Sequence, residues 1–442
     1  MGDRDDAIRE ELRQRLMQVG SRLPTSAMGR LGRIAGTALR GGRLLAFGGR
    51  HGDDAPKPPD LDGLVAMVRS LGQLKGVAMK MGQILSYIDL DVPPDLRAAL
   101  AVLQTHSPPM PFERVAGIVR ADLGERADAL LAGMSAEPVA AASIGQVHRA
   151  RLPDGTDVAV KVRYPDIDRA IAGDFRTAAV GTRMASLLFP GAHVDDLVAE
   201  ARERFLAECD YEREAAAQER FAALYPAHPT LVIPAVHRAF GSPRILVTTW
   251  MDGATFDAYL GAGPSQADRD RIGEALFAFY LGSLFRFGLY NCDPHPGNQV
   301  FLADGRVAVL DHGCTRDFDG AFRTRLANLT RAVHADERDG LHRAFVDLGM
   351  VRDGARYDFD TARSLVRAFY GPMLRDETLG IDHDQVISFQ SAFRTKIELM
   401  KLRLPGEFLF LFRIRFGLMS ILARLGARAN WHRLEQGFIA GL

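Results

Sequence analysis

Three short segments of this chain each place isolated polar residues in an apolar strand pattern or a rigid turn, and they follow one another along the sequence. Val158–Val162 is an apolar strand pattern interrupted only by Lys161. In Asp293–Asn298, two prolines and a glycine separate an aspartate from an asparagine, and in Val309–Gly313 the carboxylate of Asp311 follows an apolar run. A strand lysine, together with carboxylate and amide oxygens on rigid loops, is the set of groups that holds phosphates and Mg²⁺. The three segments together therefore predict a phosphate- and magnesium-binding apparatus.

The net charge excludes no class of partner, because 55 lysines and arginines match 55 aspartates and glutamates. We expect no nucleic-acid partner. The arginines are unevenly spread, since Arg13–Arg50 contains eight of them and no acidic residue. We interpret residues 1–60 as a basic N-terminal extension and linker. An arginine-bearing amphipathic segment would bind an acidic membrane surface, whereas a solvated arm is the alternative.

Cysteine usage and hydropathy bear on the compartment. The three cysteines, Cys209, Cys292 and Cys314, form no Cys-x-x-Cys motif, so a reducing compartment is expected. The apolar stretch 408–423 is interrupted by Arg413 and Arg415 and is too short to span a bilayer. We therefore expect a cytoplasmic protein, peripheral at the inner face of a membrane where the basic arm binds one.

The order of helical and strand patterns predicts the architecture. Apolar residues at spacings of three and four from Leu64 to Leu85 indicate an amphipathic helix, and a second helical pattern covers Asp95–Leu103. A small mixed β/α lobe follows over 131–250, and a helical lobe that carries a short hairpin covers 251–442. This order is typical of an α+β, two-lobed, protein-kinase-like fold.

Lys161 is predicted to neutralise nucleotide phosphates. A lysine in an apolar strand is costly unless it has a partner, and Glu214, on a helical pattern followed by small residues, is the carboxylate we expect to fix it. An edge-strand lysine that points to solvent is the alternative.

The two later segments supply a base and a metal site. Asp293 is predicted to accept a hydrogen bond from an attacking hydroxyl or water, and Asn298 and Asp311 are predicted to hold Mg²⁺. A surface turn that uses Asp and Asn only as turn residues is the alternative. We assign loop and structural roles, rather than metal ligation, to His295 and His312.

An alanine-rich segment is predicted to cover the phosphates. It stands where a protein kinase has a glycine-rich loop, and alanine reaches positive φ less readily than glycine, so a stiffer loop is expected. We also place Thr249 and Met251, at the hinge, in the nucleotide site. The predicted nucleotide-binding set is Ala140, Ala141, Ala142, Ser143, Ile144, Gly145, Gln146, Val147, Lys161, Glu214, Thr249 and Met251.

Several motifs resemble the UbiB/AarF family of atypical kinases, which is linked to quinone metabolism. These motifs are Lys80-Met-Gly82-Gln83, the alanine-rich segment, Glu208-Cys-Asp210, Glu214 and Asp293–Asn298. The resemblance implies that residues 61–130 form a family-specific helical extension over the pocket. It also implies a gating role for Lys80, Gly82, Gln83, Glu208 and Asp210, with Lys80 paired to Glu208 or Asp210.

The same resemblance implies a function. It predicts an ATP/ADP- and Mg²⁺-binding enzyme, an ATPase or small-molecule kinase that supports isoprenoid-quinone (ubiquinone) or lipid metabolism at a membrane. The partners it implies are a quinone or lipid precursor and enzymes of quinone biosynthesis. A soluble small-molecule phosphotransferase and a non-catalytic nucleotide-binding scaffold are the alternatives. The chain departs from the family pattern at Asn291, usually His, and at His312, usually Phe.

Overall fold

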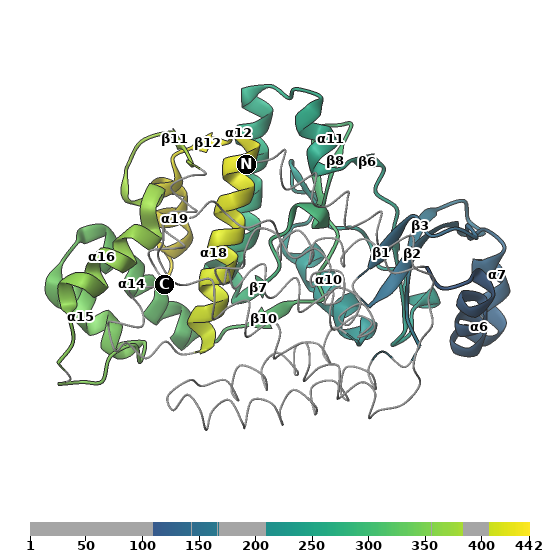
Figure 1. Ribbon diagram of the computed structural model, residues 1–442, viewed down its shortest axis with the longest axis horizontal. Coiled ribbons are helices and arrows are strands. Elements are labelled where there is room, and N and C mark those ends of the chain that lie inside the picture. Colours follow the sequence, from purple (N-terminus) through teal and green to yellow (C-terminus); the bar gives the residue numbers. More distant parts are fainter. Residues whose placement is uncertain (1–108, 143, 166, 168–208, 355, 383–405) are drawn as a thin grey trace, which may run out of the picture. The chain divides into compact units, whose positions relative to one another are not determined.

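The computed structural model describes residues 109–142, 144–165, 167, 209–354, 356–382 and 406–442 (Figure 1). The described residues form two compact units. Unit 1 comprises the described residues up to Pro153 and those from Val160 to Cys209. Unit 2 comprises Asp154–Ala159 and the described residues from Asp210 onward. The predicted helices before residue 109 lie outside the described residues, and the predicted domain boundaries stay predictions.

Unit 1 places two helices against a hairpin. Helix α6 (Phe112–Leu123) buries Val115, Ile118 and Val119 on one face at helical spacing. A 3-10 turn (Gly124–Arg126) connects it to α7 (Ala127–Leu131), which contacts strand β2. The backbone after α7 approaches this strand so closely that a Cβ at Gly133 would lie 2.0 Å from the carbonyl oxygen of Arg151. Only glycine fits there.

The strands around Lys161 form as the sequence predicts. In the first sheet β1 (Ala140–Ala142), β2 (Gly145–Arg151) and β3 (Asp157–Arg163) are neighbours. The boundary between the units falls within β3, after Ala159. On the unit 2 side the segment after β5 (Ile245–Thr249) contacts β3, because Trp250 N donates to Asp157 O at 2.9 Å.

A second sheet lies wholly in unit 2 and has the order β4-β9-β8-β6. Its strands are β4 (Leu231–Val232), β6 (Gly253–Ala254), β8 (Gln299–Leu302) and β9 (Val307–Val309). The predicted hairpin turn between β8 and β9 is present, with Gly305 at a φ of 86°. Strand β9 ends at Val309, and Leu310 beyond it is 37% exposed and donates its backbone N–H to Asn298 O at 2.9 Å. Strands β7 (Leu289–Asn291) and β10 (Thr315–Asp317) form a separate antiparallel pair.

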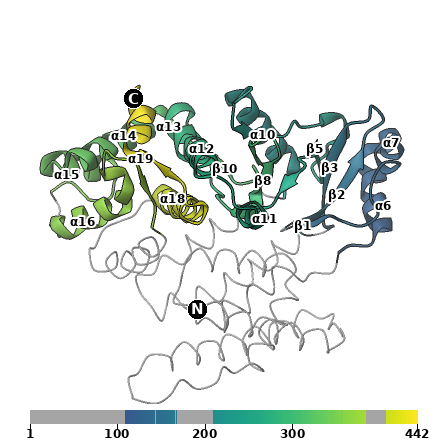
Figure 2. The same cartoon turned by 90° about the horizontal axis from the view of Figure 1, so that it is seen from above.

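Helices make up most of unit 2. The 20-residue helix α18 contacts α12, and α19 contacts α13; α14, α15 and α16 gather at one end of the unit (Figures 1 and 2). The helices are α10 (Tyr211–Leu224), α11 (Phe256–Gly261), α12 (Gln266–Phe277), α13 (Ser283–Phe287), α14 (Gly320–Ala335), α15 (Arg338–Asp347), α16 (Phe359–Tyr370), α18 (Gly406–Leu425) and α19 (Trp431–Ile439). A π turn (Ala278–Gly282) joins α12 to α13, 3-10 turns occupy Arg238–Phe240, Pro296–Asn298 and Gly371–Leu374, and β11 (Leu379–Gly380) pairs with β12 (Arg428–Ala429).

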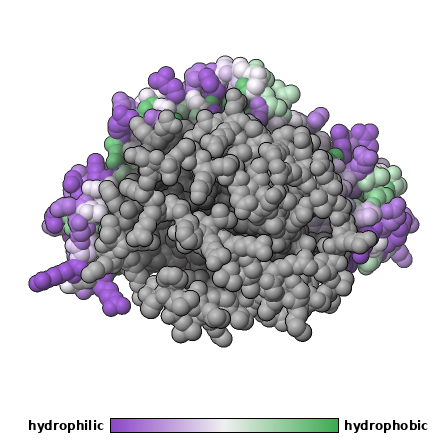
Figure 3. All heavy atoms as spheres, in the orientation of Figure 1, coloured by the Kyte–Doolittle hydropathy of each residue, from purple (hydrophilic) through white to green (hydrophobic). Residues whose placement is uncertain are grey.

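One aromatic-rich core holds these helices together. Trp431 of α19 is fully buried, packs on Phe277 with ring centroids 5.1 Å apart, and donates to Leu379 O at 2.9 Å. On the face seen in Figure 3, the described surface is mainly hydrophilic, with apolar residues in small groups. No described helix has the length and apolarity needed to cross a bilayer.

Candidate nucleotide site

The Asp293–Asn298 loop brings its two terminal side chains together. Asn298 Nδ2 donates to Asp293 Oδ2 at 3.1 Å and to the Asp293 carbonyl oxygen at 3.2 Å. The chain turns tightly between them through Pro296–Asn298, and Asn298 N donates to His295 O at 3.0 Å. Since both amide contacts use Nδ2, the Oδ1 atom of Asn298 is not committed to Asp293. The loop therefore presents a carboxylate and an amide oxygen close together.

The Asp311 carboxylate and that of Glu214 meet at Gly313. A Cβ built on Gly313 would lie 3.4 Å from Asp311 Oδ1 and 3.4 Å from Glu214 Oε2. Gly313 N donates to Asp311 Oδ1 at 2.9 Å, which fixes that side chain just beyond β9. The two carboxylates therefore lie on either side of Gly313, and Glu214 is 4% exposed.

Asn291 connects the two acidic segments. It is 1% exposed at the end of β7, its Oδ1 accepts from Asp293 N at 3.0 Å, and its Nδ2 donates to Asp311 O at 2.8 Å. In the antiparallel pair of β7 and β10, Asn291 lies opposite Thr315. Strand β10 itself lies between α10 and α18 in both ribbon views (Figures 1 and 2). The sequence marked this position only as a departure from the family pattern. The structure shows that it positions both Asp293 and Asp311.

His312 packs as an aromatic residue. Its side chain is fully buried, with its ring centroid 5.3 Å from that of Phe221 and 6.2 Å from that of Phe279. The structural role assigned to it therefore agrees with its surroundings. His295, by contrast, is exposed and accepts from Gly297 N at 3.0 Å, which stabilises the loop turn.

Helix α18 packs directly on the Asp293–Asn298 loop at Pro294. A Cβ at Gly417 would lie 2.7 Å from Pro294 Cγ and 3.0 Å from Pro294 O. Pro294 is buried, so the helix and the loop are in direct contact. Nothing in the local sequence of α18 indicates this contact, because the two residues are far apart along the chain.

Helix α10 carries Glu214 and begins at the predicted gating residue Asp210. Asp210 is the N-cap, and its Oδ1 accepts from Glu212 N at 3.0 Å. Ala215 and Ala217 are buried, and the helix contacts β5, as the small residues after Glu214 predict. The N-cap contact explains one use of Asp210, and its gating role stays a prediction. Lys80, Gly82, Gln83 and Glu208 lie outside the described residues.

In unit 1 the alanine-rich segment is a hairpin of two paired strands. Ala140, Ala141 and Ala142 face Val147, Gln146 and Gly145 in antiparallel register. Ser143, in the turn, lies outside the described residues, and Ile144 is buried.

The Gln146 side chain belongs to a buried network rather than to open solvent. Its Oε1 accepts from Met110 N at 2.7 Å, and its Nε2 is 2.8 Å from His148 Nε2. His148 Nδ1 lies 2.8 Å from Ser135 O. Burial is the larger cause that lowers the pKa of His148, and the Ser135 carbonyl opposes it. The network fixes β2 against the start of α6.

The remaining predicted residues lie on β3, on β5 and just after β5. Lys161 is half-buried on β3, where it alternates with the fully buried Val160 and Val162. Thr249 Oγ1 lies 3.0 Å from His237 Nε2, and Met251 is half-buried just after β5. Their roles at a nucleotide stay predictions.

The arrangement in unit 2 defines a class of protein. A carboxylate held beside an asparagine, with a second carboxylate fixed after a short strand, is the constellation of kinase-like phosphoryl-transfer domains. Family comparison agrees, because residues 102–345 match the ABC1 atypical kinase-like domain. The chain belongs to this family, as its resemblance to the UbiB/AarF proteins predicts, and its domain is a kinase-like, ATP-binding domain of α+β fold.

Known relatives support this assignment. The chain is 30% identical to "Atypical kinase COQ8, mitochondrial" of Saccharomyces cerevisiae over 384 residues, which cover 85% of this chain and 75% of that protein. It is 31% identical to "AarF domain-containing protein kinase 1" of Xenopus tropicalis over 59% of this chain and 51% of that protein. The complex of Rv3197 with erythromycin from Mycobacterium tuberculosis superposes with a TM-score of 0.62 at 29% identity, over 84% of this chain and 93% of that one.

Coverage of the relatives is uneven. The chain spans 51% of the Xenopus tropicalis relative and 52% of "AarF domain-containing protein kinase 1" of Xenopus laevis, about half the length of each. The activity, substrates and partners of the protein are therefore matters for proposal.

Proposed function

We propose that this protein is a Mg²⁺-dependent ATPase or small-molecule kinase that transfers the γ-phosphoryl group of ATP to water or to a small acceptor. The observation that carries the proposal is the pairing of Asp293 with Asn298 at 3.1 Å, on a loop that Asn291 ties to Asp311. Kinase-like catalysis needs little covalent chemistry from the protein. It needs these groups to be held in place.

Each residue has a role in this proposal. Asp293 accepts the hydrogen bond, and then the proton, of the attacking hydroxyl or water. Asn298 holds the Asp293 carboxylate in one orientation through Nδ2. Lys161 supplies positive charge to the phosphates, and Glu214 is the carboxylate that balances it; both assignments rest on the sequence and on the family.

The donor set suits Mg²⁺, which prefers carboxylate and carbonyl oxygens together with phosphate oxygens. Asp311, and Asn298 through Oδ1, are the residues that would hold it. When bound, the metal would neutralise charge on the phosphates. Its proposed site rests on the fixed Asp311 side chain and on the nearby Glu214 carboxylate.

The proposal also includes a biological setting for the enzyme. The link to isoprenoid-quinone or lipid metabolism, the partner enzymes and the peripheral membrane location rest on the family resemblance. The basic segment Arg13–Arg50 supports binding to an acidic surface.

The test is Mg²⁺-dependent ATP turnover by the full chain, with and without acidic liposomes. We expect Asp311→Asn and Lys161→Ala to lower turnover by roughly 100-fold or more. Asp304→Asn is the matched control, because Asp304 is an exposed turn residue bonded to Arg306. Turnover retained by Asp311→Asn would show that the metal site is misplaced. Bound Mg²⁺-ATP without turnover would favour the scaffold alternative. Stimulation by liposomes would favour the membrane enzyme over a soluble phosphotransferase.

A further inference from the structure

Two cysteines lie opposite each other beside the candidate nucleotide site. The antiparallel register of β7 and β10 pairs Asn291 with Thr315, so the next position along the ladder pairs Cys292 with Cys314. The ladder does continue to that position, because Cys292 N donates to Cys314 O at 2.7 Å. Both residues carry thiols in this structure, and both belong to unit 2.

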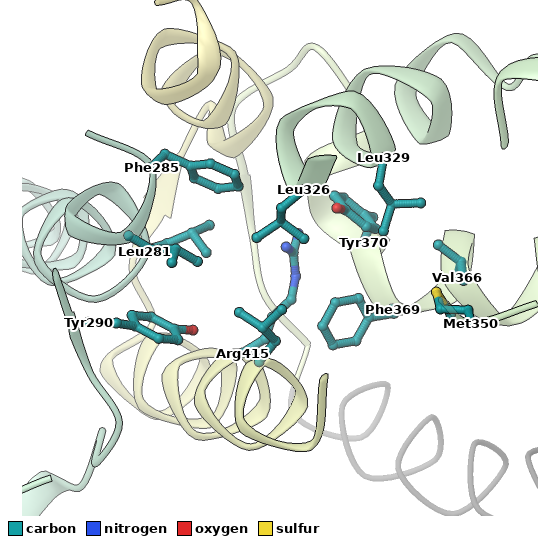
Figure 4. Close-up of a pocket in the computed structure, with 12 residues that line it drawn as sticks. Leu281, Phe285, Tyr290, Leu326, Leu329, Met350, Val366, Phe369, Tyr370 and Arg415 are labelled. Atoms are coloured by element: carbon teal, nitrogen blue, oxygen red, sulfur yellow. The ribbon is translucent and has the colours of Figure 1, made fainter. Parts of the chain in front are cut away.

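The two thiol side chains share one face of this strand pair. Neighbouring residues of a strand point to opposite faces, whereas directly opposite residues of paired strands point to the same face. Asn291 bonds to the acidic segments of the site, and Tyr290 points the other way, toward Arg415 (Figure 4). Cys292 follows Tyr290 at a spacing of two and is fully buried. Cys314 packs against the same apolar core.

The backbone spacing of such a pair suits a disulfide. Opposite residues in a hydrogen-bonded antiparallel pair have Cα atoms about 5.5 Å apart, within the roughly 4.4–6.8 Å that disulfides span. Their Cβ atoms are roughly 4.5–5.5 Å apart, so a disulfide, with about 3.8 Å between them, would draw the strand ends together by about 1 Å. Cys292 Sγ donates to Tyr290 O at 3.7 Å, a weak hydrogen bond that is lost with the thiol proton.

The two thiols differ in exposure, which sets the order in which they react. Cys314 is partly exposed, whereas Cys292 is fully buried. A small oxidant from solvent therefore meets Cys314 first, and Cys292 is the neighbour that can resolve the oxidised sulfur. In a reducing compartment disulfides are usually transient and regulatory, which suits a pair that begins as thiols.

We propose that Cys292 and Cys314 form a redox-sensitive pair, which a hydroperoxide converts into a disulfide and which added thiols restore. With hydrogen peroxide, the Cys314 sulfur attacks one oxygen, the O–O bond breaks, and a sulfenic acid and one water are formed. The Cys292 sulfur then attacks the Cys314 sulfur, the S–O bond breaks, the S–S bond forms and a second water leaves. Two thiols lose two electrons and two protons, and the peroxide is reduced to two waters.

The disulfide would close a loop that contains the acidic site. Asp293, Asn298 and Asp311 all lie between the two cysteines along the chain, and Cys292 directly precedes Asp293. A displacement of about 1 Å at a catalytic group costs up to about 100-fold in rate. We therefore expect the oxidised protein to lose turnover. This effect rests on the proposed function, whereas formation of the disulfide does not.

The first test is disulfide mapping of the full chain. The reduced protein is treated with stoichiometric hydrogen peroxide, digested without reduction and analysed by mass spectrometry. We expect peptides of one chain to be linked through Cys292 and Cys314. Cys209→Ala is the matched control, since Cys209 belongs to unit 1 and is 3% exposed, and it should form the same cross-link.

Two variants remove one thiol each. Cys314→Ser should form no disulfide and should leave Cys292 as a thiol. Cys292→Ala should leave Cys314 as a sulfenic acid that dimedone traps, because the resolving thiol is then missing. Since the two substitutions interrupt different steps, loss of the cross-link through misfolding of one variant is recognised from the other.

The second test is Mg²⁺-dependent ATP turnover of the reduced protein, the oxidised protein and the oxidised protein after dithiothreitol. We expect oxidation to lower turnover roughly 10- to 100-fold and dithiothreitol to restore it. Turnover by Cys314→Ser should not respond to peroxide, whereas that of Cys209→Ala should respond as the wild type does.

The outcomes separate the pair from the proposed enzyme function. Oxidation of Cys314 only to a sulfinic acid, or to a disulfide between chains, would overturn the pairing. A complete disulfide between Cys292 and Cys314 with unchanged turnover would overturn its control of the site. A reduced protein without turnover would instead reject the proposed function, and the disulfide map would still decide whether the pair forms.

Discussion

Two polar clusters of unit 2 are assembled in opposite ways. In the first, Asn291 and a tight loop fix Asp293 and Asp311 mostly through backbone groups, and both carboxylates remain half-exposed. In the second, Arg415, Glu435 and His334 come from three different helices and are almost entirely buried. The first cluster is held by local geometry and remains accessible to a ligand. The second depends on helix packing, so the free energy of unfolding should depend on it more strongly.

The largest effect is expected in the second cluster. Glu435→Leu leaves Arg415 buried without its carboxylate, and should lower the free energy of unfolding by about 3–5 kcal/mol. Denaturant unfolding, followed by circular dichroism, measures this. The double variant Arg415→Met/Glu435→Leu should recover most of the loss, because no charge is then left unpaired. A double variant as unstable as Glu435→Leu would mean that the pair acts through packing rather than charge.

In the first cluster, Asn291→Ala should affect both stability and activity. It leaves Asp293 N and Asp311 O without their Asn291 partners, and should cost about 1–3 kcal/mol of unfolding free energy. Because these bonds position the predicted base and metal ligand, turnover should fall by roughly 10-fold. Turnover assays and thermal unfolding check the two effects. A loss of stability without any change in turnover would separate Asn291 from the chemistry.

A glycine on α18 tests how rigidly the first cluster is supported. Gly417→Ala places a Cβ 2.7 Å from Pro294 Cγ, which should cost about 1–3 kcal/mol and displace the loop. Gly437→Ala is the matched helical control, since a Cβ there meets nothing within 4 Å and should stabilise α19 by up to about 1 kcal/mol. Thermal unfolding and turnover of the two variants would be compared. Equal stability of both would show that the loop yields without cost.

The same contrast explains what the sequence could predict. The Val158–Val162 strand, the β8–β9 hairpin and the kinase-like class follow from local patterns, namely alternating burial, a glycine in a turn, and polar residues after apolar runs. The contact of Asn298 with Asp293 is likewise local, because only four loop residues separate them.

The other contacts could not be predicted because they join distant segments. Glu435 meets Arg415 only after α18 and α19 pack together, and Gly417 meets Pro294 only after α18 packs on the loop. In the sequence, Arg415 appeared only as a charge that interrupts an apolar stretch. Its guanidinium is ion-paired with Glu435 and packed on the rings of Phe369 and Tyr370, so the interruption is part of the core of unit 2.

The smallest effect on stability is expected at an ion pair nearer the surface, between Asp336 and Arg363. Comparing it with the buried cluster shows how much of the effect comes from burial and how much from charge. Asp336 accepts from Arg363 Nε at 2.7 Å and lies 3.1 Å from Arg367 Nη1, with 30% of its side chain exposed. The hydrogen bond from Arg363 is the main cause that lowers the pKa of Asp336 below its ordinary value of 3.8. A lowered pKa stabilises the folded state above the unfolded-state pKa, and this contribution disappears as the pH falls through the folded-state value. Because Arg363 is also partly exposed, solvent screening keeps the contribution of this pair smaller than that of the buried one.

Asp336→Asn isolates that charge, because asparagine tolerates the left-handed conformation found there, with a φ of 56°. We expect the variant to unfold at a slightly lower temperature than the wild type at pH 7, and the difference to vanish as the pH falls below the ordinary carboxyl range. Calorimetric scans from pH 7 to acid, at low and high salt, measure it. Asp336 is also the C-cap of α14, so a stability difference that persists in acid would assign the effect to the cap conformation rather than to charge. A difference as large as that of Glu435→Leu would remove the distinction between the buried cluster and the exposed pair.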